Sequence, residues 1–198
     1  MCLRVSSSCA MRVSVIACSV LAAGFANAQV LNLQAFLDGP SESPPNASPG
    51  TGLVDVTMDL TAHTMHIHAM FSGLIGGTTA AHIHAATASA FTGVAGVASQ
   101  TPSFAGFPLG VTSGMYEGMY DMTLTSSYNP SYVTNNGGTT ASAEAALFNA
   151  MSSGRAYFNI HTNASPGGEI RGFFRIVPSA GSLSLMAMGG LCAIRRRR

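Results

Sequence analysis

Hydrophobic and polar residues alternate along most of the chain between residues 30 and 176. From Val54 to Leu60 the alternation is strict, with polar side chains at every second position. A period of two is typical of a β-strand that turns one face to the core. Clusters rich in glycine, proline, asparagine and serine, such as 39–52 and 163–168, interrupt the pattern and favour turns. We therefore expect strands at Val30–Leu37, Val54–Leu60, Met65–Phe71, Ala80–Ala85, Val94–Gln100, Tyr116–Thr125, Arg155–Thr162 and Glu169–Ile176.

One segment, Thr140–Ser153, follows a different period. Its apolar residues recur at the spacing of a helix face, and Gly154 supplies a stop after it. We predict a short helix over about 140–153, laid over the edge of the sheet. Together with about seven or eight strands, this indicates an all-β fold, an antiparallel β-sandwich or barrel.

The last two predicted strands can be aligned by their side chains. Directly opposed residues of an antiparallel pair share a face, so one register brings polar residues opposite polar ones. A shift by one residue would set Ile170 against His161. We therefore predict the pairs His161–Glu169, Asn159–Arg171, Tyr157–Phe173 and Ile160–Ile170.

Charged residues are scarce, at 9% of 198, and lysine is absent. This excludes a disordered polyelectrolyte and a coiled coil, which need far more charge. Between residues 29 and 176 three arginines stand against eight acidic residues, so this region is acidic. It would repel phosphate, which argues against a nucleic-acid partner.

The first 28 residues have the features of a secretory signal peptide. Arg4 and Arg12 precede an apolar run from Val13 to Ala23, and Ala26-Asn27-Ala28 matches the small-residue cleavage pattern. We expect the mature protein to begin near Gln29. Three of the four cysteines lie in this segment and the fourth is Cys192, so the domain at 29–176 needs no disulfide.

The last segment, 177–198, is expected to act as a sorting tail. Val177-Pro178 precedes sixteen small or apolar residues and then four terminal arginines. Such a run spans roughly 24 Å as a helix, short of the roughly 30 Å hydrocarbon core. The layout resembles the PEP-CTERM signal of Gram-negative bacteria, although the Pro-Glu-Pro core is lacking. The resemblance implies processing by an exosortase-type enzyme, with membrane contact only through this tail.

Motifs of the region 29–176 resemble the CHRD domain, the module first named from chordin. The similarity runs from Leu33 to Phe174 and departs at Ser43, where an apolar residue is usual, and at Ala85, where glycine is usual. It implies an extracellular β-domain without established catalysis. The motifs are Leu37-Asp38-Gly39, Glu42-Ser43-Pro44-Pro45, Thr51-Gly52, Ala81-His82-Ile83-His84, Phe107-Pro108-Leu109-Gly110, Gly154 to Thr162 and Pro166 to Gly172.

The histidines are the candidate functional residues. On a strand, His82 and His84 project to one face about 6 to 7 Å apart, a spacing that suits two ligands of one metal. His161 completes a candidate three-histidine site for copper or zinc, with Glu169 as a fourth ligand or an orienting carboxylate. The alternative is a structural polar cluster in which Asn159, Glu169 and Arg171 satisfy the imidazoles. His66 and His68 are expected on the surface and His63 in a turn.

Two functions follow from these alternatives. The first is an exported, non-catalytic module of the cell surface or extracellular matrix that binds surface polysaccharide or a matrix protein. The loops at 39–52 and 126–139, the second rich in tyrosine and asparagine, would make such contacts. The second is a copper- or zinc-binding protein of the periplasm or cell surface, with weak redox activity like that of superoxide dismutase and Arg171 near the metal. No hydrolase motif is present.

Overall fold

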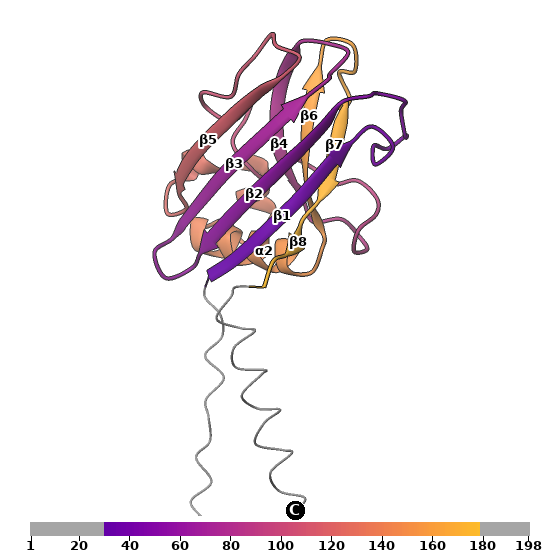
Figure 1. Cartoon of the computed structure of the whole chain (residues 1–198). Coiled ribbons are helices and arrows are strands. Elements are labelled where there is room, and N and C mark those ends of the chain that lie inside the picture. Colours follow the sequence, from indigo (N-terminus) through magenta and orange to yellow (C-terminus); the bar gives the residue numbers. More distant parts are fainter. Residues whose placement is uncertain (1–29, 179–198) are drawn as a thin grey trace, which may run out of the picture.

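The computed structural model describes residues 30–178 and shows one curved antiparallel β-sheet (Figure 1). This confirms the predicted all-β antiparallel fold with a short helix. The predicted signal peptide (1–28) and all but two residues of the predicted tail (177–198) lie outside the described residues. The elements are β1 (Val30–Asp38), β2 (Thr51–Asp59), β3 (Thr64–Ser72), β4 (Thr78–Ala85), β5 (Gly114–Asp121), the 3-10 helix η1 (Thr125–Ser127), α1 (Pro130–Asn135), α2 (Thr140–Ser152), β6 (Ala156–Thr162), β7 (Ile170–Phe173) and β8 (Arg175–Ile176).

The sheet curls into a half-barrel rather than a closed barrel. Its strands lie in the order β4-β6-β7-β1-β2-β3-β5, with β8 also paired to β1. Phe104, from the loop between β4 and β5, fills the inside of the curve. Its ring lies 5.7 Å from that of Phe158 on β6 and 5.4 Å from that of Tyr120 on β5, measured between centroids. One aromatic side chain thus connects the two ends of the curled sheet.

The predicted alternation decides which residues form the core. In β1, β2 and β3 buried apolar residues alternate with positions that face outward, including the exposed Phe36 and Met70. Helix α2 covers the inner side, and its Ala143, Leu147, Ala150 and Met151 are buried. The helix begins after Thr139, whose hydroxyl accepts a hydrogen bond from the amide of Ser142 at 3.1 Å. No helix within residues 30–178 is long and apolar enough to cross a membrane.

The segment 94–100 is not the strand that its pattern predicts. It runs beside the free edge of β4 and bonds to it irregularly, because serine hydroxyls replace part of the backbone ladder. The amide of Ala98 donates to Ile83 O at 2.8 Å, whereas the amide of Ile83 donates to the hydroxyl of Ser99 at 2.8 Å. The result is a loop that protects the edge of the sheet from further strand pairing.

Strand β5 is shorter than predicted, ending at Asp121 instead of continuing to Thr125. The Asp121 carboxylate accepts hydrogen bonds from the amide of Thr123 at 2.8 Å and from its hydroxyl at 2.6 Å, and this turn ends the strand. The predicted strand at 169–176 is likewise divided into β7 and β8 at Phe174, which is fully buried.

The predicted contact loop at 126–139 contains helix α1. Asn129 caps this helix by accepting a hydrogen bond from the amide of Ser131, and Pro130 occupies its first turn. Tyr128 and Tyr132 are both buried in the core. Their rings are therefore not available for the surface contacts that the composition of this segment suggested.

Glu169, which is fully buried, links its own segment to three other parts of the chain. Burial alone would raise the pKa of its carboxyl, but the hydrogen bonds that the carboxylate accepts outweigh burial and lower the pKa. Two of these come from loop amides and two from hydroxyls. The donors are the amides of Ile75 at 2.5 Å and Gly76 at 3.1 Å and the hydroxyls of Ser48 and Thr162, each at 2.6 Å.

We predict that Glu169→Gln lowers the free energy of unfolding by about 2–4 kcal/mol, because an amide group cannot accept hydrogen bonds from all four donors. Urea denaturation at pH 7 measures the change. The difference from wild type should shrink as the pH falls through the lowered pKa, where the wild-type carboxyl also becomes neutral. Glu117→Gln, at a side chain that is 70% exposed, is the control and should cost less than about 0.5 kcal/mol. Equal costs for the two variants would contradict this role for Glu169.

Candidate functional site

The site lies on the outer face of β4, β6 and β7, where loops cover the sheet. Unlike β1–β3, β6 is buried along both faces, since six of its seven residues are buried and His161 is half-buried. The register sets His82 of β4 opposite Asn159 of β6 and His84 opposite Tyr157. Polar side chains at these positions are therefore taken out of water by the loops above them.

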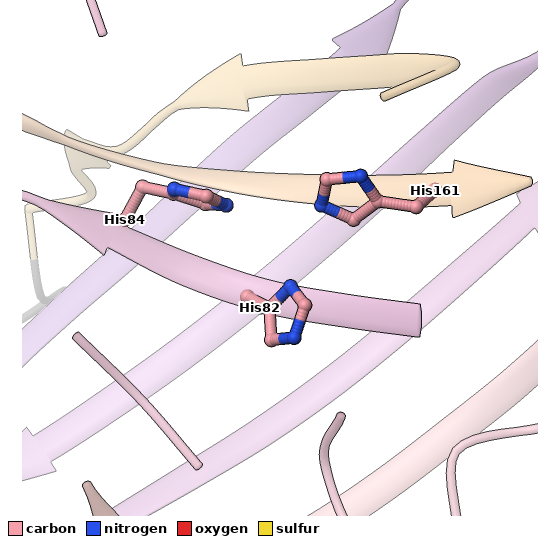
Figure 2. A group of neighbouring side chains, drawn as sticks. All are labelled: His82, His84 and His161. Atoms are coloured by element: carbon pink, nitrogen blue, oxygen red, sulfur yellow. The ribbon is translucent and has the colours of Figure 1, made fainter. Parts of the chain in front are cut away.

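The three candidate histidines meet in this covered region. Figure 2 shows His82 and His84 on β4 and His161 on the neighbouring strand β6, with their rings turned toward a common space. Their ring centroids are separated by 5.2 to 6.0 Å. One nitrogen from each ring can be chosen so that all three lie within 4.8 Å of one another. The structure thus brings together the three residues that the sequence singled out.

Backbone carbonyl groups hold each ring in place. A carbonyl oxygen only accepts hydrogen bonds, so the ring nitrogen facing it must carry the hydrogen. The second nitrogen of each neutral ring then keeps its lone pair. The three hydrogen bonds run from His82 Nε2 to Pro102 O at 2.6 Å, from His84 Nδ1 to Ala95 O at 2.9 Å, and from His161 Nδ1 to Pro166 O at 2.9 Å.

The second nitrogens are His82 Nδ1, His84 Nε2 and His161 Nε2. All three are buried without a hydrogen-bond partner among residues 30–178. Burial lowers the pKa of all three imidazoles, and that of His84 falls to about 4. At neutral pH the site therefore presents three uncharged rings whose lone pairs have no donor.

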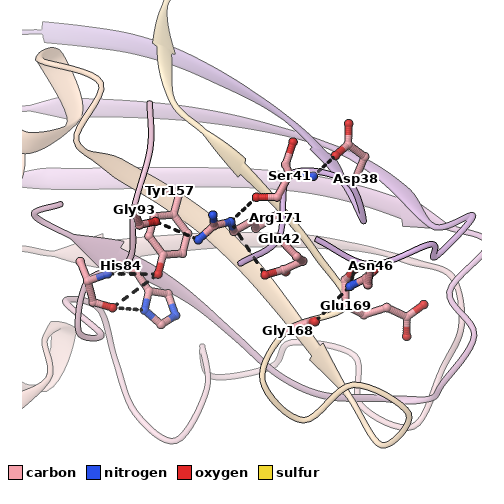
Figure 3. A network of polar contacts seen from close by, with 11 residues as sticks. Asp38, Ser41, Glu42, Asn46, His84, Gly93, Tyr157, Gly168, Glu169 and Arg171 are labelled. Atoms are coloured by element: carbon pink, nitrogen blue, oxygen red, sulfur yellow. Dashed lines mark hydrogen bonds and ion pairs between the residues drawn. The ribbon is translucent and has the colours of Figure 1, made fainter. Parts of the chain in front are cut away.

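An ordered polar network surrounds Arg171 beside the histidines (Figure 3). Tyr157 stacks on His84 with ring centroids 4.8 Å apart, and the guanidinium of Arg171 lies 4.8 Å from the centre of the Tyr157 ring on β6. Arg171 donates to the backbone oxygens of Ser41 and, at 3.1 Å, Gly93. It thus supports the site through Tyr157, and these two hydrogen bonds go to backbone carbonyls rather than to an imidazole.

The sequence-derived register of β6 and β7 is confirmed for Tyr157–Phe173, Asn159–Arg171 and Ile160–Ile170, but it does not extend to His161–Glu169. The amide of Glu169 donates to the oxygen of Ile160 at 2.8 Å, so the ladder becomes irregular here. As a result the carboxylate of Glu169 accepts a hydrogen bond from the hydroxyl of Thr162. Thr162 follows His161 on β6, so its side chain points to the opposite face of the sheet. Glu169 therefore stands outside the group of candidate ligands, and its carboxylate is occupied elsewhere.

Asn159 and Glu42 add two more unpartnered atoms beside the three ring nitrogens. Asn159 Oδ1 and Glu42 Oε1 are buried and have no hydrogen-bond partner in the described part of the chain. Both lie 2.7 Å from the point where a Cβ on Gly168 would stand, so glycine leaves a small polar space there. Burial raises the pKa of Glu42 to about 7, against the opposing effect of Arg171, whose Nε lies 3.8 Å from Glu42 Oε2.

Glu42 and the three carbonyl groups that anchor the rings are not among the site residues predicted from the sequence. Glu42 belongs to the Glu42-Ser43-Pro44-Pro45 motif, which was a usable signal. The carbonyls of Pro102, Ala95 and Pro166 carry no such signal, because any residue type has one.

The remaining histidines lie away from this group. His66 and His68 are on the outer face of β3, as expected, and the Nε2 of His66 lies 3.1 Å from Glu117 Oε1. His63 occupies the turn between β2 and β3 with a φ of 54°. Its Nδ1 is 2.7 Å from Glu144 Oε2, which ties that turn to α2.

Comparison with known proteins gives one match. The family model described as the CHRD domain covers residues 33–174, which is most of the chain and all of the strands and loops that build the site. No curated protein and no solved structure matches the chain.

We predict that the free energy of unfolding of wild type falls relative to that of Glu42→Gln as the pH rises. Between pH 5 and pH 8 the difference between the two proteins should change by about 2–3 kcal/mol. The folded state holds the Glu42 proton up to a pKa of about 7, whereas the unfolded chain releases it near 4.5. Urea denaturation in EDTA at both pH values measures this. Other titrating groups cancel in the difference, so a constant difference would show that Glu42 is not buried in this way.

Proposed function

The chain is a member of the CHRD family, and we propose that its domain binds one zinc or copper(II) ion through His82, His84 and His161. One observation carries the proposal. Three neutral rings converge so that one nitrogen from each can lie within 4.8 Å of the others. Each ring also has one nitrogen anchored to a backbone carbonyl and a second nitrogen that is buried without a donor among the described residues. Such anchoring is the usual outer support of metal-bound histidine.

A bound water does not satisfy this arrangement. A buried polar atom without a partner costs about 1–3 kcal/mol, so three at one place need a common partner. Water has two hydrogens, whereas the site presents three acceptors. The carbonyl anchors prevent any of the rings from turning its N–H inward without losing its own hydrogen bond. A cation accepts all three lone pairs at once.

The donor set decides which metals fit. Neutral imidazole suits zinc and copper, and no cysteine lies among the described residues to supply thiolate. Three protein ligands leave a fourth position for water or a small exogenous group, as in sites that are not purely structural. At typical metal–nitrogen distances of about 2.0–2.1 Å the ion would draw the three nitrogens closer together than the 4.8 Å within which they lie.

For the molecule as a whole we propose an exported, non-catalytic module of the cell surface, extracellular matrix or periplasm. The signal-like residues 1–28 and the sorting-tail pattern of 177–198 support export and exosortase-type processing, and surface polysaccharide or a matrix protein is the proposed partner. A dismutase-like redox role draws less support. Its arginine would need to face the metal, whereas Arg171 donates hydrogen bonds to two backbone oxygens and pairs with Glu42.

The direct test is elemental analysis after dialysis against zinc or copper(II), using the full chain with its four cysteines replaced by serine to remove competing thiols. We expect about one metal ion per chain, and less than about a tenth of that in His82→Ala, His84→Ala or His161→Ala. His63→Ala, in the turn between β2 and β3, is the matched control and should keep the zinc. Retention of zinc by the three variants, or an empty wild type, would overturn the proposal.

Unfolding experiments distinguish the metal site from the structural polar cluster. If the histidines bind metal, adding zinc at about a hundred times its dissociation constant should stabilise wild type by about 2.7 kcal/mol and leave His161→Ala unchanged. If they form only a polar cluster, the alanine variants lose stability in EDTA and zinc stabilises neither protein. The second result would show that the three histidines have a purely structural role.

A further inference from the structure

The outer face of β3 and β5 carries an unusual set of exposed side chains. Met70 of β3 is 43% exposed, and Met115 and Met119 of β5 are 64% and 66% exposed. Figure 1 shows these two strands side by side at one edge of the sheet, with the helices behind the sheet. The inner face of the same strands supplies the core, so these methionines do not serve packing within the described residues.

The strand register places imidazoles among these thioethers. Opposed residues in antiparallel strands have Cβ atoms about 4.5–5.5 Å apart, and diagonal neighbours remain within reach of long side chains. His68 thus has Met115 and Met119 as its two diagonal neighbours. The opposed pairs on this face are His66 with Met119, His68 with Glu117, and Met70 with Met115.

One of these imidazoles is already oriented. His66 Nε2 lies 3.1 Å from Glu117 Oε1, and a carboxylate that accepts the N–H of a ring leaves the other nitrogen free to bind a metal. The remaining nitrogen, Nδ1, is on a half-exposed side chain opposite Met119. The face therefore combines a carboxylate-supported histidine, a second histidine and three flexible thioethers.

We infer that this face is a second metal site, selective for copper(I), with His66 and Met119 as its central ligands and His68 and Met115 completing the coordination. Thioether sulfur is a soft ligand that favours copper(I), whereas zinc, calcium and magnesium prefer imidazole, thiolate or oxygen. The inference is independent of the buried three-histidine site, which contains no sulfur and lies on β4 and β6. The two sites differ in donor type, exposure and position in the sheet.

The test is an anaerobic titration with copper(I) against a colorimetric chelator such as bicinchoninate. It uses the full chain in which Cys2, Cys9, Cys18 and Cys192 are replaced by serine, since thiolates would outcompete thioethers. The triple variant His82→Ala, His84→Ala, His161→Ala removes the buried site. In that background we expect about one copper(I) ion per chain, and a loss of affinity of more than about tenfold in Met115→Leu, Met119→Leu.

A matched control replaces buried methionines instead. Met58 and Met65 are fully buried, so Met58→Leu, Met65→Leu changes the same chemical group without touching the exposed face. Silver(I), a redox-inert substitute, should shift the NMR methyl signals of Met115 and Met119 and leave those of Met58 and Met65 in place. Equal copper(I) affinity of the exposed-face variant and the control variant, or methyl shifts confined to other methionines, would overturn the inference. Loss of binding with the buried three-histidine site alone would overturn it as well, and would leave the proposed function intact.

Discussion

The removal of water from the outer face of β4, β6 and β7 is the constraint on which the site depends. These strands bury their inner face in the core, and loops bury much of the other, so polar side chains there must find partners within the protein. Backbone carbonyls meet the demand for one nitrogen of each histidine, and the Tyr157 ring and the loop carbonyls accommodate Arg171. The atoms left without partners gather in this same region, which is why it is the candidate for a ligand.

The outer face of the sheet has two regions of different chemistry, one at each end. At the β4–β6–β7 end the loops cover the strands, fix the rings and exclude water, so a metal would meet prearranged imidazoles of lowered pKa. At the β3–β5 end the outer face is open, and its methionines and histidines are partly exposed on flexible side chains. A site at the first end is held by backbone hydrogen bonds, whereas a site at the second must be assembled by the ion itself.

The sequence motifs of the CHRD domain meet on the loop-covered outer face of β4, β6 and β7. Glu42 from the Glu-Ser-Pro-Pro motif approaches Arg171 of the Gly-Glu-Ile-Arg-Gly motif, and Gly168 of the same motif makes room for Asn159 and Glu42. The histidines come from two further motifs on β4 and β6. Motifs scattered over more than a hundred residues of sequence thus converge on one face of the sheet.

Strands β1 to β4 and β6, the helix α2 and most of the last hairpin register were predictable from the amino-acid sequence, because apolar alternation and polar pairing are local signals. The sequence also singled out His82, His84 and His161. Which ring nitrogens are free follows from the folded arrangement of the loops, since it depends on the carbonyls of Ala95, Pro102 and Pro166, which lie 5 to 20 residues from the rings that they anchor. The tertiary structure likewise turned Glu169 away through one irregular hydrogen bond, and it buried Tyr128 and Tyr132, because such choices rest on packing between segments rather than on residue type.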